Sequence, residues 1–258
     1  MRKHKISAFV ITKNEEDRIE DCLKSIYNWV DQLIVMDSGS NDNTVKIAKR
    51  YTEEVYQTDW PGYGKQRNRA LKKCLHDWVL TIDADERLSD GAKKEIDNLF
   101  SKENLPYTMI KFPWQTYFLK KPLRFGRFST PQGKLFHQRE ACFNDGAVHE
   151  QIVMPKRICY TTKNPLEHYS WRDYQHLQCK HLEYAHLQAK ERYHKGQRAS
   201  ISQAILSSCY CFFWQYLIRL GFINGRRGFI IAMTLAHYEM HRYFDMICQD
   251  LENKDKAL

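Results

Sequence analysis

Several common signatures are missing from this chain of 258 residues. No Gly-x-Gly-x-x-Gly motif follows the first apolar segment and no Gly-Lys-Ser/Thr phosphate-binding loop occurs, which argues against dehydrogenases and P-loop kinases. Glycine and proline are sparse, at 11 and 7 residues, and no Ser-, Gln- or Pro-rich tract interrupts the chain, so we expect a folded rather than a disordered protein. No uninterrupted apolar run reaches the roughly 20 residues that a bilayer-spanning helix requires.

Cysteine occurs eight times, but no two cysteines have the Cys-x-x-Cys spacing. This distribution favours reduced thiols that pack in the interior over disulfides or structural zinc. The basic start, Met1–Ser7, leads into a short apolar segment that ends at Lys13–Glu16. That segment is too short for the core of a signal peptide, so we expect a cytoplasmic protein.

The net charge of +9 predicts a negatively charged partner, and nucleic acid, anionic lipid headgroups and phosphorylated sugars all qualify. Basic residues become frequent after Lys111 and recur at Arg219, Arg226 and Arg227. The chain has no helix-turn-helix, RNP or zinc-finger signature, and its clustered acidic residues would repel a nucleic-acid backbone. We therefore expect no nucleic-acid partner.

The first hundred residues alternate between strand-like and helix-like patterns. Short apolar runs predict strands at Ile6–Thr12, Gln32–Met36, Glu54–Tyr56 and Trp78–Ile82. Helical spacing predicts helices that contain Ile19 to Ile26, Val45 to Ala48 and Gly64 to Cys74. A capping box at Thr12–Glu15 is expected to open the first helix. The alternation predicts an α/β domain with a mostly parallel sheet and helices on both faces.

Three polar clusters follow predicted strands directly: Thr12–Glu15, Asp37–Ser40 and Asp83–Glu86. Taken singly, each has an ordinary explanation as a helix cap, a turn or a solvated acidic loop. Ligands of parallel sheets bind at the carboxyl ends of the strands, so three such clusters together indicate a ligand site. Without a glycine cradle, a diphosphate can be bound through Mg²⁺ or Mn²⁺ held by carboxylates, and Asp83 and Asp85 can supply these.

The motifs of this half resemble those of the family-2 glycosyltransferases, which have the GT-A fold. The resemblance lies in Val10–Glu16, in Val35–Ser40 with Asp42–Thr44, and in Leu80–Glu86, which match the family pattern in order and spacing. It implies a catalytic domain over residues 1–165, with a nucleotide-sugar-binding half at 1–103 and an acceptor half at 104–165. Residues 166–258 would then form a helical C-terminal extension.

The likeness continues to the C-terminal half. Gly146–Glu150, Leu166–His168 and the aromatic-rich segment Phe212–Tyr243 resemble the lipopolysaccharide-core β-glucosyltransferases of Gram-negative bacteria. This implies an inverting hexosyltransferase that uses UDP-glucose or another UDP-hexose and a divalent cation. The implied acceptor is a heptose of the lipopolysaccharide or lipooligosaccharide inner core, which is a lipid-linked oligosaccharide.

The resemblance also implies roles for individual residues. Asp37 would bind the uracil or ribose, Asp83 the ribose or the metal, and Asp85 the metal, which His168 would help to hold. Further implied nucleotide-sugar-binding residues are Thr12, Asn14, Glu15, Ser38, Lys65, Arg69, Ala84, Lys134 and Arg139. Lys65 and Arg69 would face the donor phosphates, and Lys134 and Arg139 would stabilise the leaving diphosphate.

Inversion by direct displacement needs one carboxylate to take the proton of the acceptor hydroxyl. The favoured base is Glu150, where the resemblance also places it, and Asp145 is a rival five positions earlier. Gln132 and Gly133 are expected to shape the acceptor side.

The tail contains two apolar segments, Ala204–Ile218 and Gly228–Ala236, separated by the basic Arg219–Arg227. Two interpretations remain open: an interfacial hairpin with Trp214, Tyr216 and the arginines at headgroup level, or a helical cap on the catalytic domain. A lipid-linked acceptor would bring the enzyme to the cytoplasmic face of the inner membrane as a peripheral protein.

Other functions also fit the sequence. The acceptor could instead be a polyprenyl phosphate, a peptide or another glycan, because the donor half would look the same. A non-catalytic module that binds a sugar nucleotide, or a nucleic acid, is the alternative from a different class. The sequence does not fix the donor sugar, the linkage position, the oligomeric state or the choice between Mg²⁺ and Mn²⁺.

Overall fold

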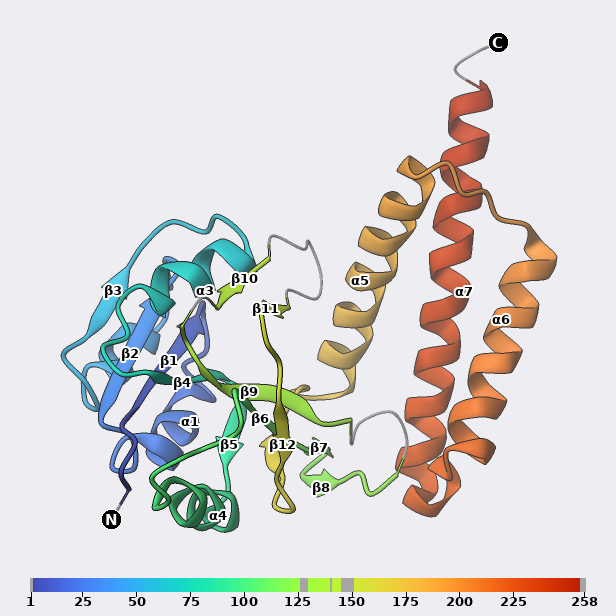
Figure 1. Ribbon diagram of the computed structural model, residues 1–258. Coiled ribbons are helices and arrows are strands. Elements are labelled where there is room, and N and C mark those ends of the chain that lie inside the picture. Colours follow the sequence, from blue (N-terminus) through green and yellow to red (C-terminus); the bar gives the residue numbers. More distant parts are fainter. Residues whose placement is uncertain (1, 126–129, 140, 145–150, 256–258) are drawn as a thin grey trace. The chain divides into compact units, whose positions relative to one another are not determined.

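The computed structural model describes residues 2–125, 130–139, 141–144 and 151–255, and the chain divides into two compact units (Figure 1). Unit 1 comprises residues 1–115 and 130–169, and unit 2 comprises residues 116–129 and 170–258. The sequence-based division at residue 165 assigns residues 116–129 to the catalytic domain, whereas the structure assigns them to unit 2. In the structure Phe118 and Leu123 of that segment pack with Trp171, Ile231 and Leu235 of unit 2.

Unit 1 is built on a seven-stranded sheet with the strand order β12-β6-β9-β4-β1-β2-β3. Its strands are β1 (Ile6–Thr12), β2 (Gln32–Asp37), β3 (Val55–Gln57), β4 (Trp78–Asp83), β6 (Met109–Phe112), β9 (Gln132–His137) and β12 (Cys159–Thr161). Strands β1, β2, β3 and β4 are parallel, and β12 is parallel to β6, whereas β9 runs antiparallel to both of its neighbours. The mostly parallel sheet predicted from the sequence is therefore confirmed.

Apolar side chains of β1 alternate between the two faces of the sheet, because successive residues of a strand point to opposite sides. Ile6, Ala8 and Val10 belong to a core that includes residues of α1 (Ile19–Ile26) and α4 (Asp90–Phe100). Phe9 and Ile11 belong to a second core. This second core includes Ala70 and Leu71 of α3 (Tyr63–Leu71), so helices cover both faces; α2 (Thr44–Ala48) packs with α1.

The predicted capping box at Thr12–Glu15 is wrong. Thr12 ends β1, and the first helix begins only at Ile19, after an N-cap at Arg18 that makes no side-chain capping bond. Asn14 has a φ of 54°, which turns the chain out of the strand before a helix can start. The backbone NH of Glu15 donates a hydrogen bond to the hydroxyl of Thr44 at 2.8 Å. Residues 12–15 therefore form part of a loop and do not cap a helix.

Short antiparallel pairs complete the strands. They are β5 (Glu86–Leu88) with β13 (Leu166–His168), β7 (Trp114–Phe118) with β8 (Lys121–Pro122), and β10 (Cys142–Phe143) with β11 (Ile152–Val153). In the β5–β13 pair, His168 lies opposite Glu86. This pairing brings the Leu166–His168 motif to the acidic cluster that follows β4.

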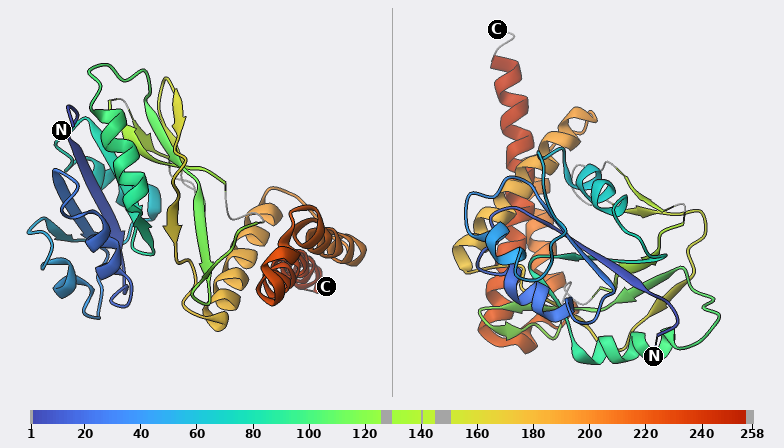
Figure 2. Two further views of the ribbon diagram at one scale, coloured as in Figure 1. Left: turned by 90° about the horizontal axis from the view of Figure 1, so that it is seen from below. Right: turned by 90° about the vertical axis from the view of Figure 1, so that its left-hand side faces the viewer.

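Unit 2 is mainly three helices, α5 (Tyr174–His194), α6 (Ile201–Phe213) and α7 (Gly225–Asp255). Figure 1 shows α7 between α5 and α6, and Figure 2 shows the same three helices from two further sides. A capping box of Ser200 and Gln203 begins α6, and Asp173 caps α5. A π-helical turn (η2, Trp214–Ile218) and a 3₁₀ turn (η3, Gly221–Asn224) connect α6 to α7. Among the described residues, no helix is both long and apolar enough to cross a membrane.

Candidate active site

The register of the parallel strands brings the three polar clusters to one edge of the sheet. Thr12 at the end of β1 pairs with Asp37 at the end of β2, and Ile11 pairs with Asp83 at the end of β4. The buried hydroxyl of Thr12 has no hydrogen-bond partner among the described residues. Because a buried, unpaired hydroxyl is costly, this group is suited to bind a ligand or a water molecule.

Asp37 is fully buried and organises the turn that follows β2. One of its carboxylate oxygens accepts hydrogen bonds from the NH groups of Gly39 and Ser40, both at 3.0 Å, and the other accepts the hydroxyl of Ser40 at 2.5 Å. Gly39 has a φ of 80°, which an L side chain would strain. Since a carboxylate offers about four acceptor positions, Asp37 keeps capacity for one more donor.

The loops after β1 and β2 are tied together. The side-chain oxygen of Asn14 accepts a hydrogen bond from the backbone NH of Asn41 at 2.9 Å. The backbone NH of Asn14 donates to the hydroxyl of Ser40 at 2.8 Å. Ser38 accepts a hydrogen bond at 3.0 Å from Gln66 of α3. Glu15 accepts the guanidinium of Arg18 at 2.8 Å. The predicted residues Thr12, Asn14, Glu15, Asp37 and Ser38 thus lie on two adjoining loops.

Asp83 is held between two cations. Its carboxylate lies 2.7 Å from Arg67 Nη2 and 2.8 Å from Lys134 Nζ, and Lys134 also reaches Glu86 at 2.7 Å. Arg67 further donates to the hydroxyl of Thr81 at 2.7 Å. Burial alone would raise the pKa of Asp83, but Arg67 and Lys134 outweigh it and hold that pKa well below its usual range.

Glu86 is completely buried, and this burial raises the pKa of its carboxyl group; nearby Asp83 adds to the effect and Lys134 opposes it. Glu86 also accepts the indole NH of Trp114 at 3.0 Å. Burial tends to lower the pKa of Lys134, but Asp83 and Glu86 raise it overall, so the ammonium stays charged. The arrangement places fixed positive charge beside the predicted donor-binding carboxylates.

Asp85 and His168 face each other at 3.5 Å between Oδ2 and Nε2, and Arg18 Nη1 is 3.8 Å from the same oxygen. The backbone carbonyl of Asp85 accepts the NH of Tyr169 at 2.8 Å, which fixes the strand next to it. Trp114 stacks on the imidazole with ring centroids 4.4 Å apart. The sequence-predicted pair of metal ligands is therefore brought together.

The pair has the right chemistry for a divalent ion. Two ligand atoms about 2.1 Å from one ion lie roughly 3 to 3.5 Å apart, which agrees with the distance between Asp85 and His168. The buried Nδ1 of His168 has no hydrogen-bond partner among the described residues. Within the described part of the chain, no group of three or more His, Cys, Asp or Glu side chains is arranged to hold a metal. An ion here would need further ligands from a bound diphosphate or water.

The structure does not gather every predicted residue at this edge. Lys65 and Arg69 lie on α3 beside Gln66 and Arg67, which contact Ser38 and Asp83 at this edge; Lys65 is exposed, and Arg69 forms an exposed ion pair with Asp59 at 2.7 Å. Arg139 follows β9 just beyond His137, which pairs with Trp78 at the amino end of β4. Arg139 thus lies at the end of β4 opposite to Asp83. Ala84 is buried between the two aspartates.

The predicted base Glu150 and its rival Asp145 lie outside the described residues. Gln132 and Gly133, predicted for the acceptor side, begin β9. A Cβ atom on Gly133 would come within 2.5 Å of the Met109 sulfur, so glycine permits the close approach of β9 to β6.

Sequence reasoning missed Arg67, Arg18, Gln66 and Trp114. The helical period contained a signal for Arg67, because it shares a face with Gly64, Ala70 and Leu71, all of which are buried, whereas Lys65 does not. A charged residue on the apolar face of a helix indicates a buried partner, which here is Asp83. Arg18 and Trp114 had no comparable signal, since the acidic residues they reach after β4, Asp85 and Glu86, are distant from them in the sequence.

Known proteins resemble this chain along most of its length. The sequence profile of glycosyl transferase family 2 matches residues 7–152. An uncharacterized glycosyltransferase of Rickettsia felis is 34% identical over 90% of this chain and 86% of its own length. The lipopolysaccharide core biosynthesis glycosyltransferase LpsC of Rhizobium meliloti is 27% identical over 90% of this chain and 88% of its own.

Among solved structures, glucosyl-3-phosphoglycerate synthase from Mycobacterium tuberculosis, in complex with Mg²⁺ and UDP, matches 45% of this chain and 44% of its own. That match has 27% sequence identity and a TM-score of 0.36. The family profile covers more than half of the chain, and its matched segment contains β1, β2 and β4 with their polar ends. The chain therefore belongs to glycosyltransferase family 2 and has the GT-A fold.

Proposed function

We propose that this glycosyltransferase transfers a hexose, glucose in our assignment, from a UDP-sugar to a heptose of the lipopolysaccharide or lipooligosaccharide inner core, with inversion. The observation that carries the donor assignment is the convergence of Asp37, Asp83, Asp85 and His168 at the carboxyl ends of β1, β2 and β4. The relative LpsC, named for lipopolysaccharide core biosynthesis, supports the acceptor class. The alternative acceptors are a polyprenyl phosphate, a peptide or another glycan.

The donor is assigned to the two loops and the strand ends. Asp37, which keeps one acceptor position, would bind the uracil or ribose, and Thr12 would donate or accept with its unpaired hydroxyl. Asp85 and His168 would hold Mg²⁺ or Mn²⁺ together with the donor diphosphate. When bound, this ion would neutralise charge on the leaving UDP. Lys134 and Arg67 hold Asp83 in place and add positive potential.

The reaction forms a bond between the acceptor oxygen and the anomeric carbon, while the bond from that carbon to the diphosphate breaks and its electron pair leaves with UDP. The acceptor proton passes to a carboxylate, which we assign to Glu150 rather than Asp145. Residues on both sides of this segment are anchored. Phe143 of β10 exchanges hydrogen bonds of 2.7 and 2.8 Å with Asn68 of α3, the helix from which Arg67 reaches Asp83. This anchoring supports a base close to the donor site.

The base assignment is tested by comparing Glu150→Gln with Asp145→Asn. Glu150→Gln is expected to keep UDP-sugar binding and to lower turnover by about 10²- to 10⁴-fold, because proton transfer to a positioned base contributes about that much. Asp145→Asn is the matched control and should retain most of the turnover. The reverse pattern would exchange the two roles, and full turnover in both variants would contradict a carboxylate base in this segment.

The acceptor is tested by product analysis with two substrates. A heptose-containing core oligosaccharide on its lipid should be glucosylated with β configuration, and a polyprenyl phosphate should not. Transfer to the polyprenyl phosphate alone would refute the proposed acceptor and leave the donor assignment intact. UDP-sugar binding without transfer to any acceptor would favour a non-catalytic sensor. With this acceptor, the enzyme would work as a peripheral protein at the cytoplasmic face of the inner membrane.

A further inference from the structure

Helix α6 of unit 2 has its large apolar side chains on the outside. Leu206, Tyr210 and Phe213 follow one another at spacings of four and three residues, so they share one face of the helix. Their exposed fractions are 69%, 65% and 55%. A helix that merely caps a globular domain would turn such residues inward.

The opposite face of α6 carries small residues. Ala204 is fully buried, Cys211 packs against the apolar core of unit 2, and the hydroxyl of Ser208 donates to the carbonyl of Ala236 in α7 at 2.9 Å. In α7, Gly228, Ala232 and Ala236 recur every four residues and are buried. Small residues let the two helices pack closely, as they do in helices that have lipid as a neighbour. Helix α6 therefore exposes its large apolar residues and buries its small ones, the opposite of what is usual for a helix that faces water.

The exposed apolar surface continues through the connection to α7. Leu217 and Ile218 of η2, Phe222 and Ile223 of η3, and Phe229 at the start of α7 are all exposed. We call these five residues, together with Leu206, Tyr210, Phe213 and Trp214, the apolar surface. Monomeric proteins rarely expose so many contiguous apolar side chains without a partner.

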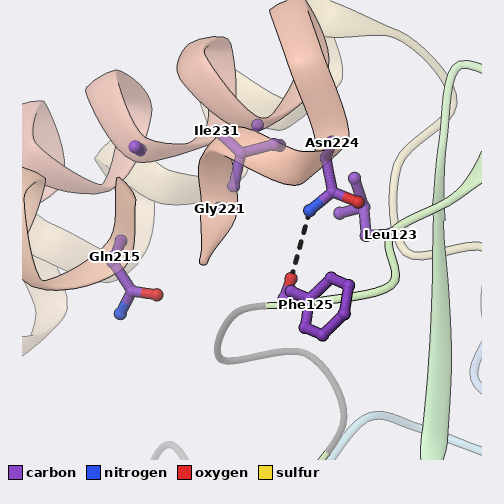
Figure 3. Close-up of a pocket in the computed structure, with 8 residues that line it drawn as sticks. Leu123, Phe125, Gln215, Gly221, Asn224 and Ile231 are labelled. Carbon is purple, nitrogen blue, oxygen red and sulfur yellow. Dashed lines mark hydrogen bonds between the residues drawn. The ribbon is translucent and has the colours of Figure 1, made fainter. Parts of the chain in front are cut away.

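Close packing fixes the connection that carries this surface. A Cβ atom on Gly228 would lie 1.9 Å from the carbonyl oxygen of Gly221, so the two backbones are in direct contact. The side chain of Asn224 accepts the NH of Arg124 at 2.9 Å and donates to the carbonyl of Phe125 at 3.3 Å (Figure 3). The turn that carries part of the apolar surface is therefore held by backbone packing and by hydrogen bonds to residues 124 and 125.

The segment of the chain that carries the apolar surface has charge of one sign. From Arg192 to Tyr238 the chain contains six Lys and Arg residues and no Asp or Glu. Arg219, Arg226 and Arg227 lie in and beside the turn, and none of the three forms an ion pair with a carboxylate in the described part of the chain. Apolar and aromatic side chains bordered by arginines match the requirements of a lipid interface with anionic headgroups.

We propose that the apolar surface, with Arg219, Arg226 and Arg227, docks this protein onto an anionic lipid bilayer. A second copy of the chain fits less well, because a symmetric contact would bring the arginines of both copies together without acidic partners. Aromatic side chains such as Trp214 and Tyr210 are suited to the headgroup region, since each combines an apolar ring with a polar group. This inference does not depend on the donor or the acceptor.

The test is co-sedimentation of the full chain with vesicles, without any sugar substrate. Wild type should bind vesicles of phosphatidylcholine with about one third phosphatidylglycerol, and bind weakly to phosphatidylcholine alone, with an affinity that falls as salt is added. The variant Tyr210→Ser/Phe213→Ser should lose about tenfold or more in partitioning. Each of Arg219→Gln and Arg226→Gln should lose roughly fivefold on the anionic vesicles only.

Matched controls lie in unit 1. Leu75→Ser removes a 77% exposed leucine, and Lys46→Gln removes an exposed lysine of α2; neither should change vesicle binding. Circular dichroism of each variant checks that its helices are intact. Wild type that ignores anionic vesicles, or surface variants that bind as well as wild type, would overturn the proposal. A wild-type dimer that Tyr210→Ser/Phe213→Ser converts to monomer, with vesicle binding unchanged, would assign the surface to self-association instead.

Discussion

The strand ends of unit 1 and helix α6 of unit 2 depart from the usual distribution of side chains in opposite directions. At the strand ends, the charged groups of Lys134 and Glu86 are buried, and Lys134 pairs with the partly buried Asp83. On α6, large apolar groups such as Leu206 and Tyr210 face outward. Both arrangements cost free energy in the isolated protein. The comparison underlies our two proposals, in which each region binds something outside the chain: a charged ligand at the strand ends and an apolar, anionic surface at α6.

The largest expected effect breaks the charge network of unit 1. Lys134→Met should lower the free energy of unfolding by about 3–5 kcal/mol, because Glu86 would remain buried without its cation and Asp83 would lose one of its two ion pairs. Urea unfolding followed by circular dichroism measures the change. Lys46→Met, at an exposed position on α2, is the control and should stay within about 0.5 kcal/mol of wild type. A loss below about 1 kcal/mol for Lys134→Met would mean that the network is not strongly coupled.

A second prediction compares two leucines of unit 2. Leu235 is buried in the core formed with Trp171 and Ile231, so Leu235→Ala should cost about 2–5 kcal/mol. Leu206 is exposed on α6, so Leu206→Ala should change the stability by no more than about 0.5 kcal/mol. The same urea titration serves both variants. Similar losses would show that Leu206 is buried in solution, for instance in an oligomer, and would remove the contrast between the two regions.

A smaller effect concerns pH. The pKa of Asp83 is lower in the folded protein than the unfolded value of about 3.9, because Arg67 and Lys134 outweigh the effect of burial. The stability that its ion pairs add is present above the unfolded pKa and is lost as the pH falls toward the folded pKa. Unfolding midpoints measured between about pH 6 and pH 3 should therefore fall more steeply for wild type than for Asp83→Asn. Parallel curves would contradict the assigned ion pairs.

Much of the fold could be predicted from local patterns. Strand β1 has the predicted bounds, and β2 and β4 end one residue beyond the predicted ends. These strands are buried on both faces and carry continuous apolar runs, which is the strongest local signal for a parallel sheet. The helix cap predicted for the loop after β1 was wrong, because Asn14 adopts a left-handed backbone conformation and the loop forms hydrogen bonds with residues 40–44. These contacts form only after β2 has paired with β1, so the local sequence around residue 14 does not predict them.

The candidate site was predictable where it follows strand ends and was not where it depends on distant contacts. Asp37, Asp83 and Asp85 follow from position alone, and the β5–β13 pairing brings His168 to them from about 80 residues away. The structure adds Arg67, which holds Asp83, to the predicted basic residues of α3, of which Lys65 is exposed and Arg69 pairs with Asp59. Its position along α3 places Arg67 on the buried face of the helix, which is why it is the basic residue that pairs with Asp83.

The donor site is tested most directly by calorimetric titration of a panel of nucleotide sugars, with and without Mn²⁺, into wild type and Asp85→Ala. The account predicts that wild type binds one UDP-hexose, UDP-glucose in our assignment, and that binding needs the ion. Asp85→Ala should lose this binding, because we assign Asp85, with His168, to hold the ion. Glu103→Ala, at an exposed position, is the control and should bind normally. Failure of every nucleotide sugar to bind wild type, or unchanged ion-dependent binding by Asp85→Ala, would contradict the site.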